Sequence, residues 1–145
     1  MVYALKETWR VLRPSGTLID LRPLSIDVPL LILTNAGWKS AGLPDQSQDR
    51  VHDNAADRAM RAVVHDGLFS RTKRKYFDVN NFWNSLAALK EDVEERWKED
   101  VIVPKGIWRE ARLLYKNGSG KQRVRIAFRK KISVYQKMVK TIEPI

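Results

Sequence analysis

The chain has 145 residues, 43% of them hydrophobic, with five Trp, four Tyr and four Phe, which is enough apolar material for one folded domain over residues 1–145 and argues against global disorder. It has no cysteine, which excludes disulfides and thiolate chemistry. No apolar run approaches the ~20 residues needed to cross a bilayer, so we expect a cytoplasmic protein with no membrane partner.

The net charge of +10 is concentrated in the second half of the chain. Residues 1–68 carry eight basic and eight acidic side chains, whereas residues 69–145 carry nineteen and nine. A charge concentrated in this way is typical of proteins that bind nucleic acid or an acidic partner. A solvated polar face gives the same pattern without a ligand.

The chain opens with an apolar stripe at helical spacing, formed by Val2, Leu5, Trp9 and Leu12. This helix should end near Arg13, because Pro14 disfavours helical geometry at the residue before it. Residues 17–21 then predict a strand with apolar residues on both faces, which is typical of a parallel sheet covered by helices on two sides. Residues 28–34 predict a second strand, and residues 38–41 a short antiparallel return.

The remaining elements alternate between helices and strands. They are a helix at 53–65, a charged strand at 69–77, a helix capped by Asn80 or Asn81, a helix whose first turn holds Pro104, and a strand at 121–136. The last strand alternates strictly between apolar and basic residues, so we expect it to be half-buried.

The most specific pattern joins the first helix to the first strand. It reads Arg10-Val11-Leu12-Arg13-Pro14-Ser15-Gly16 and leads directly into Thr17-Leu18-Ile19. A helix that reverses onto a sheet in so few residues needs a stop and a permissive backbone, which Pro14 and Gly16 supply. Residues 5–21 resemble the class I, Rossmann-like SAM-dependent methyltransferases, in which a helix ends in Arg-Val-Leu-(Lys or Arg)-Pro-Gly-Gly before a hydrophobic strand. Ser15 departs from that pattern, because the family usually has glycine there.

The resemblance implies a fold class. We expect an α/β domain with a partial Rossmann-like methyltransferase sheet, whose short parallel part near the N-terminus is followed by helices and a C-terminal antiparallel strand pair. Strands 69–77 and 121–136 would form that pair. The first helix and strand would match the fourth helix and fifth strand of the parent fold.

The resemblance also implies what this chain lacks. In the family, a glycine-rich turn and an acidic residue on the first half of the sheet hold the methyl donor, and both precede the matched segment. None of the seven glycines here forms such a turn after a strand. We therefore expect no cofactor to bind the isolated chain, since SAM is implied by the family alone.

The function implied is that of a truncated methyltransferase-like protein, inactive by itself. It would be a remnant, an adaptor, or a subunit that completes a site in trans. Its partner would be a complementary SAM-binding chain or a second copy of itself.

The first set of candidate site residues is Asp20 and Arg22, at the carboxyl end of the first predicted strand. Open α/β sheets bind ligands at that edge, so these two are the substrate-side candidates. A solvated ion pair at a strand end is the plainer interpretation. Catalytic residues cannot be assigned, and His52 and His65 are too far apart in one helix to share a metal.

The second set belongs to the alternative function, a small basic binding protein for nucleic acid or an acidic partner. Its candidates are cations on two predicted strands, each set on one face of its strand, which would form one surface if the strands pair. They are Arg71, Lys73 and Lys75 on the first strand and Arg123, Arg125, Arg129 and Lys131 on the second. Charged residues also protect exposed sheet edges from aggregation, which explains the same pattern without a ligand.

Overall fold

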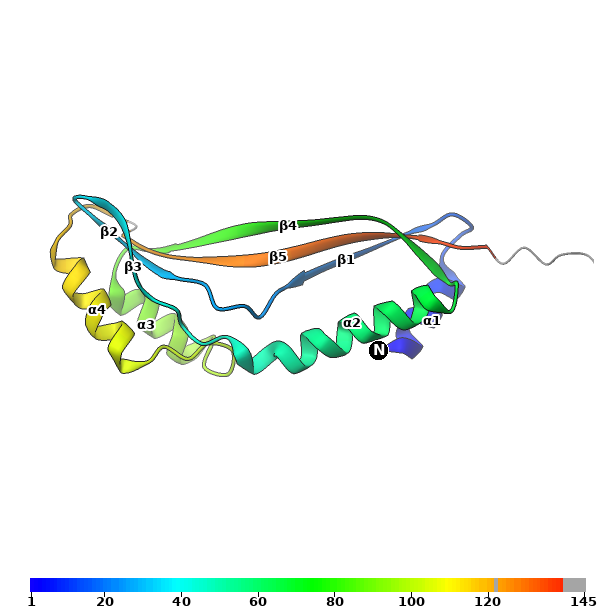
Figure 1. Ribbon diagram of the computed structural model, residues 1–145, viewed down its shortest axis with the longest axis horizontal. Coiled ribbons are helices and arrows are strands. Elements are labelled where there is room, and N and C mark those ends of the chain that lie inside the picture. The colour runs from blue at the N-terminus through cyan, green and yellow to red at the C-terminus, as the bar shows by residue number, and fades with distance from the viewer. Residues whose placement is uncertain (122, 140–145) are drawn as a thin grey trace, which may run out of the picture. The chain divides into compact units, whose positions relative to one another are not determined.

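The structure, a computed structural model, describes residues 1–121 and 123–139. Its elements in chain order are α1 (Val2–Val11), β1 (Thr17–Pro23), β2 (Leu30–Thr34), β3 (Gly37–Gly42), η1 (Ser47–Asp49), α2 (Arg50–His65), β4 (Phe69–Trp83), α3 (Leu86–Glu95), α4 (Lys105–Lys116) and β5 (Val124–Lys137), as Figure 1 shows. No helix among the described residues is long and apolar enough to cross a membrane.

The chain divides into two compact units. Unit 1 contains Met1–Pro23, Val51–Phe77 and the chain from Lys130, and unit 2 contains Leu24–Arg50 and Asp78–Arg129. Strands β4 and β5 run through both units, so each unit has its own part of the sheet and its own helices.

In unit 1, α1 and α2 lie on the same face of the strands (Figure 1). The apolar stripe predicted for the first helix is confirmed, because its four residues pack against the core of this unit. That core consists of Met60, Val63, Leu68, Phe69 and Tyr135. Burying a large apolar side chain of this kind stabilises the fold by roughly 1.5–3 kcal/mol.

Unit 2 has a separate core beneath α3 and α4. The alternation predicted for the last strand is confirmed here, since Val124 and Ile126 are fully buried. Trp97 makes edge-on ring contacts with Trp83 and Phe128, at centroid distances of 5.5 and 5.1 Å.

The cap predicted for α3 was misplaced. Strand β4 runs through Asn80 and Asn81 as far as Trp83, so neither asparagine begins a helix. Ser85 caps α3 instead, and its Oγ accepts a hydrogen bond from the backbone N–H of Ala88 at 3.1 Å. A serine hydroxyl satisfies an unpaired N–H of the first turn in the same way that asparagine would.

The expected fold class is wrong in its parallel part. β1 pairs antiparallel with β5, and β2 pairs antiparallel with β3 and β5. A parallel neighbour requires a crossover connection of a dozen or more residues, whereas the strands that follow β1 form a hairpin. The described residues therefore form an α/β fold with an antiparallel sheet and no Rossmann-like parallel segment.

The late strands do pair as expected. β4 pairs with β5. The hydroxyl of Thr72 donates to the carbonyl oxygen of Val134, and Arg74 Nε donates to Ser133 Oγ. Residue numbers rise along one strand as they fall along the other, so the two strands run antiparallel.

Candidate functional site

The turn that leads into β1 requires special backbone geometry at two adjacent positions. The N–H of Gly16 donates to the carbonyl oxygen of Arg13 at 2.9 Å, and Ser15 has φ of 59°. Proline at the second position and positive φ at the third are features of a type II turn, which favours glycine at that third position. A Cβ on Gly16 would lie 2.8 Å from the Arg13 oxygen, so Gly16 has no room for a side chain. Positions 15 and 16 thus favour glycine for separate physical reasons, which accounts for the Gly-Gly pair in the pattern that this segment resembles.

The substrate-side candidates Asp20 and Arg22 belong to a four-residue ion network in unit 1. Arg22 donates to both carboxylate oxygens of Asp20, from Nε at 2.7 Å and from Nη2 at 2.8 Å. Its Nη2 also lies 2.6 Å from Asp57 Oδ1 of α2. Lys131 Nζ of β5 lies 2.6 Å from the same oxygen, and its side chain is only 3% exposed. Two cations and two anions therefore cancel one another.

The register of the sheet explains this grouping. Arg22 is the cross-strand partner of Lys131, and Asp20 that of Ser133, so these side chains share the face that α2 covers. Asp57 reaches them from the helix. The sequence analysis did not identify Asp57 as a site residue. The signal that could have found it is the spacing of Asp53 and Asp57, which lie one turn apart on a helix predicted to cover the sheet.

The network favours the charged forms of Asp57 and Arg22. Burial opposes ionisation of Asp57, but hydrogen bonds from Lys131 and Arg22 outweigh it and lower the pKa of this carboxyl. Burial likewise acts against the charged form of Arg22, but hydrogen bonds to Asp20 and Asp57 raise the pKa of the guanidinium. These hydrogen-bonded ion pairs connect β1 and β5 to α2.

One edge of β1 has no partner among the described residues. The N–H of Lys137 donates to the carbonyl oxygen of Gly16, and the N–H of Leu24 donates to that of Arg129. These bonds place the even-numbered residues of β1 in the hydrogen-bonded positions opposite β5. In an antiparallel ladder the intervening residues point their backbone groups the other way. The odd-numbered residues therefore direct theirs to the open edge, from Thr17, Ile19, Leu21 and, with a carbonyl alone, Pro23.

The face of β1 away from α1 and α2 is apolar and uncovered. Ile19 is 60% exposed and Leu21 is 57% exposed, and their cross-strand partners Val134 and Ile132 are only half-buried. The expectation that residues 17–21 are buried on both sides is therefore wrong, because helices cover one face alone. Edge strands commonly carry charges that block pairing with another chain, and β1 has none on this face.

The seven cations nominated for nucleic acid do not form one surface. Arg71, Lys73 and Lys75 of β4 are exposed, and no described residue pairs with them. The other four, Arg123 just before β5 and three cations on β5, are held by neighbours. Arg123 donates to the Tyr115 carbonyl and lies 3.9 Å over its ring, and Arg125 lies 4.7 Å over the ring of Trp38.

The other two β5 cations are paired with carboxylates. Arg129 Nη2 donates to Asp78 Oδ2 at 3.1 Å, and this ion pair raises the pKa of Arg129. Lys131 is buried in the network with Asp57. Of the seven nominated cations, only Arg71, Lys73 and Lys75 thus have no partner among the described residues and remain available to an anion.

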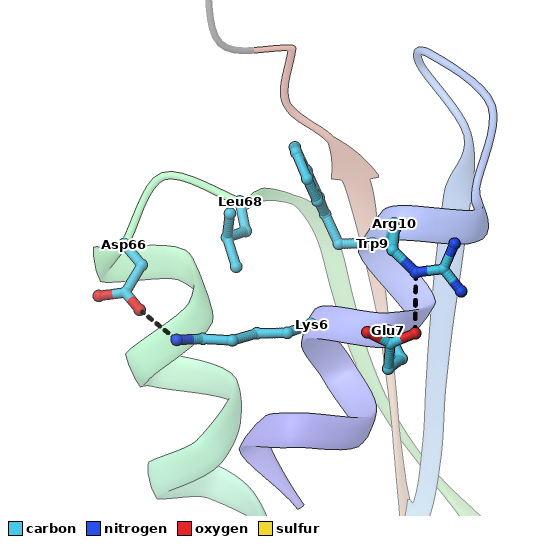
Figure 2. Close-up of a pocket in the computed structure, with 6 residues that line it drawn as sticks. All are labelled: Lys6, Glu7, Trp9, Arg10, Asp66 and Leu68. Carbon is cyan, nitrogen blue, oxygen red and sulfur yellow. Dashed lines mark hydrogen bonds and ion pairs between the residues drawn. The ribbon is translucent and has the colours of Figure 1, made fainter.

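Unit 1 has an opening of about 520 Å³ beside α1. Figure 2 shows the residues that line it. Its two cations already have partners. Lys6 Nζ lies 3.9 Å from Asp66 Oδ2, and Arg10 Nε donates to Glu7 Oε2 at 2.9 Å (Figure 2). The paired charges leave little to attract an ionic ligand to this opening.

Comparisons of the chain with protein-family models, with curated proteins and with solved structures found no match. The resemblance of residues 5–21 to the methyltransferases therefore stays a prediction, and the function must be argued from the geometry described above.

Proposed function

We propose that this chain is a methyltransferase-like protein that binds no SAM and methylates nothing by itself, and that it acts with a separate chain that carries the donor-binding half of the sheet. The turn at Arg13–Gly16 supports the proposal, because its geometry favours glycine at the two positions where the resembled pattern has glycine. The chain keeps one of these glycines and has Ser15 at the other.

The open edge of β1 is the observation that carries the proposal. In the family that residues 5–21 resemble, the donor-binding half packs against this edge and one face of the sheet. Here the same edge presents backbone groups that no described residue pairs with, beside the exposed side chains of Ile19 and Leu21. A strand added to such an edge gains main-chain hydrogen bonds and buries apolar area at once.

Calorimetric titration of the isolated chain with SAM tests the first part of the proposal. The expected result is no measurable heat of binding at micromolar protein. A dissociation constant in the micromolar range would overturn the claim that this chain needs a second one.

Complementation by two separate chains tests the second part. The donor-binding half of a class I methyltransferase is expressed as a separate chain, and its SAM affinity is measured with and without this protein. We expect this protein to raise the affinity, and the variant with Ile19→Lys and Leu21→Lys to leave it unchanged. Equal effects of the wild type and the variant would mean that the β1 edge is not the docking surface.

A second candidate function is the binding of single-stranded nucleic acid along β4. The observation that favours it is the run of exposed cations at Arg71, Lys73 and Lys75, which have no partner in the described part of the chain, beside the exposed rings of Tyr76 and Phe77. Such a surface can contact phosphates and stack on bases. Gel-shift titration at two salt concentrations tests this function, and the absence of a shift at low salt would exclude it.

A further inference from the structure

Unit 1 contains a second opening, of about 640 Å³, between α2 and the first half of β4. It is distinct from the opening in Figure 2 and from the open edge of β1. Its walls are formed by Asp57, Met60, Arg61, Val64, His65, Ser70, Arg71, Arg74 and Tyr135. The volume falls within the range of roughly 300–1,000 Å³ that is typical of small-molecule sites.

Three arginines line this opening, and one of them is fixed in place. Arg74 Nε donates to Ser133 Oγ at 3.1 Å, and Ser133 is fully buried. Arg61 and Arg71 have no hydrogen bond or ion pair with any described residue. The guanidinium of Arg74 is therefore fixed in position, while those of Arg61 and Arg71 keep all of their N–H donors for a ligand.

The single carboxylate in the wall does not cancel these charges. Asp57 Oδ1 already accepts hydrogen bonds from Arg22 and Lys131, so its negative charge is balanced within the ion network. The opening keeps an excess of positive charge. Guanidinium groups present paired N–H donors in a plane that matches two oxygens of a phosphate.

The rest of the wall suits the remainder of a small ligand. Met60, Val64 and Tyr135 give it an apolar and aromatic part, and Ser70 adds a hydroxyl. A ligand with one phosphate and a compact organic portion would use both kinds of surface. An extended polymer would need contacts that continue along β4 beyond the opening.

We propose that this opening is a binding site for a small phosphate-bearing molecule, held by Arg61, Arg71 and Arg74. The site is separate from the β1 edge, so it does not depend on the methyltransferase-like function.

The test is a titration of the ¹⁵N-labelled full chain with inorganic phosphate, and then with pyrophosphate, at low ionic strength. We expect saturable shifts centred on Ser70, Arg71 and the α2 residues of the wall. The double variant Arg61→Gln, Arg71→Gln removes two guanidiniums that form no hydrogen bond or ion pair within residues 1–121 and 123–139. We expect it to weaken binding by at least about tenfold, because charge-assisted hydrogen bonds are lost.

The matched control is the double variant Lys73→Gln, Lys75→Gln, which removes the same two positive charges, both from β4 and both outside the opening. We expect less than about a twofold change, since only long-range attraction is lost. Equal weakening by both pairs, or shifts that never saturate, would overturn the proposal in favour of diffuse attraction. So would a single-stranded oligonucleotide that binds while phosphate and pyrophosphate do not. Circular dichroism of both double variants verifies that they stay folded.

Discussion

Ser15 holds a backbone conformation that its own side chain disfavours. A non-glycine residue in the left-handed region costs roughly 1–2 kcal/mol relative to the right-handed one, and Ser15 has φ of 59°. Glycine at this position would remove the strain but would add entropy to the unfolded chain.

We expect Ser15→Gly to raise the free energy of unfolding by about 0.5–1 kcal/mol, because the relief of strain exceeds the entropy that glycine adds. Urea denaturation of the variant and the wild type measures the difference. Gly16→Ala is the control and should destabilise by about 1–3 kcal/mol, since its Cβ would meet the Arg13 oxygen at 2.8 Å. A Ser15→Gly chain less stable than the wild type would mean that the turn adopts another geometry in solution.

The lowered pKa of Asp57 gives the fold a defined acid sensitivity. Because the folded pKa lies below the unfolded value of about 3.9, the stabilisation is complete above that value and is lost as the pH falls through the folded pKa. We expect the stability difference between the wild type and Asp57→Asn to be constant at neutral pH and to shrink below about pH 4. Urea midpoints collected between pH 7 and pH 2.5 measure it, and a difference that does not change with pH would contradict the ion network.

At the scale of elements, the helices and the pairing of β4 with β5 were predictable, whereas the direction of β1 relative to its neighbour was not. Helical stripes and the turn before β1 are local patterns, and the structure confirms them at α1 and α4. The direction of β1 is not local. An apolar run such as residues 17–21 occurs both in a buried parallel strand and in an edge strand with one uncovered face, so periodicity alone cannot separate the two.

Strand β5 shows a second limit of local reasoning. Its even-numbered residues Val124 and Ile126 are buried in unit 2, whereas its odd-numbered residues Lys131, Ser133 and Tyr135 are buried in unit 1. A strict period of two predicts Lys131 on the solvent side. Its burial depends on Asp57, a contact between residues 74 positions apart that no window of sequence contains.

The contrast between the edges of unit 1 leads to a prediction about association. β4 carries exposed cations that oppose pairing with another strand, and β1 does not. We expect the isolated protein to self-associate as its concentration rises and Ile19→Lys to shift it toward the monomer. Sedimentation velocity measures the two populations. Lys73→Gln is the matched control on β4. Identical sedimentation profiles for the wild type, Ile19→Lys and Lys73→Gln would mean that the β1 edge does not mediate self-association.

For the whole molecule, the net charge overstates the number of cations that are free to bind a polyanion. Of the seven nominated cations, Arg123 and the three on β5 are engaged by carboxylates, rings or a carbonyl within the fold. The sequence shows how many cations the chain has, but their internal partners depend on tertiary contacts. Of the nominated cations in the described part of the chain, Arg71, Lys73 and Lys75 are free to neutralise phosphates, so this set can neutralise three.

We therefore expect a weak salt dependence if single-stranded nucleic acid binds. Three contacts give a slope of log K against log salt near about −2, whereas all seven cations would give about −5. Fluorescence anisotropy of a labelled oligonucleotide over a series of salt concentrations measures the slope. A value near the steeper limit would show that β5 releases its cations on binding.

The placement of the five tryptophans allows the fluorescence of each unit to be followed separately. Trp9 belongs to unit 1, whereas Trp38, Trp83, Trp97 and Trp108 belong to unit 2. A Trp9→Phe chain would therefore emit from unit 2 alone. Quenching or melting curves compared with those of the intact chain would then report, by subtraction, whether one half of the polypeptide loosens before the other.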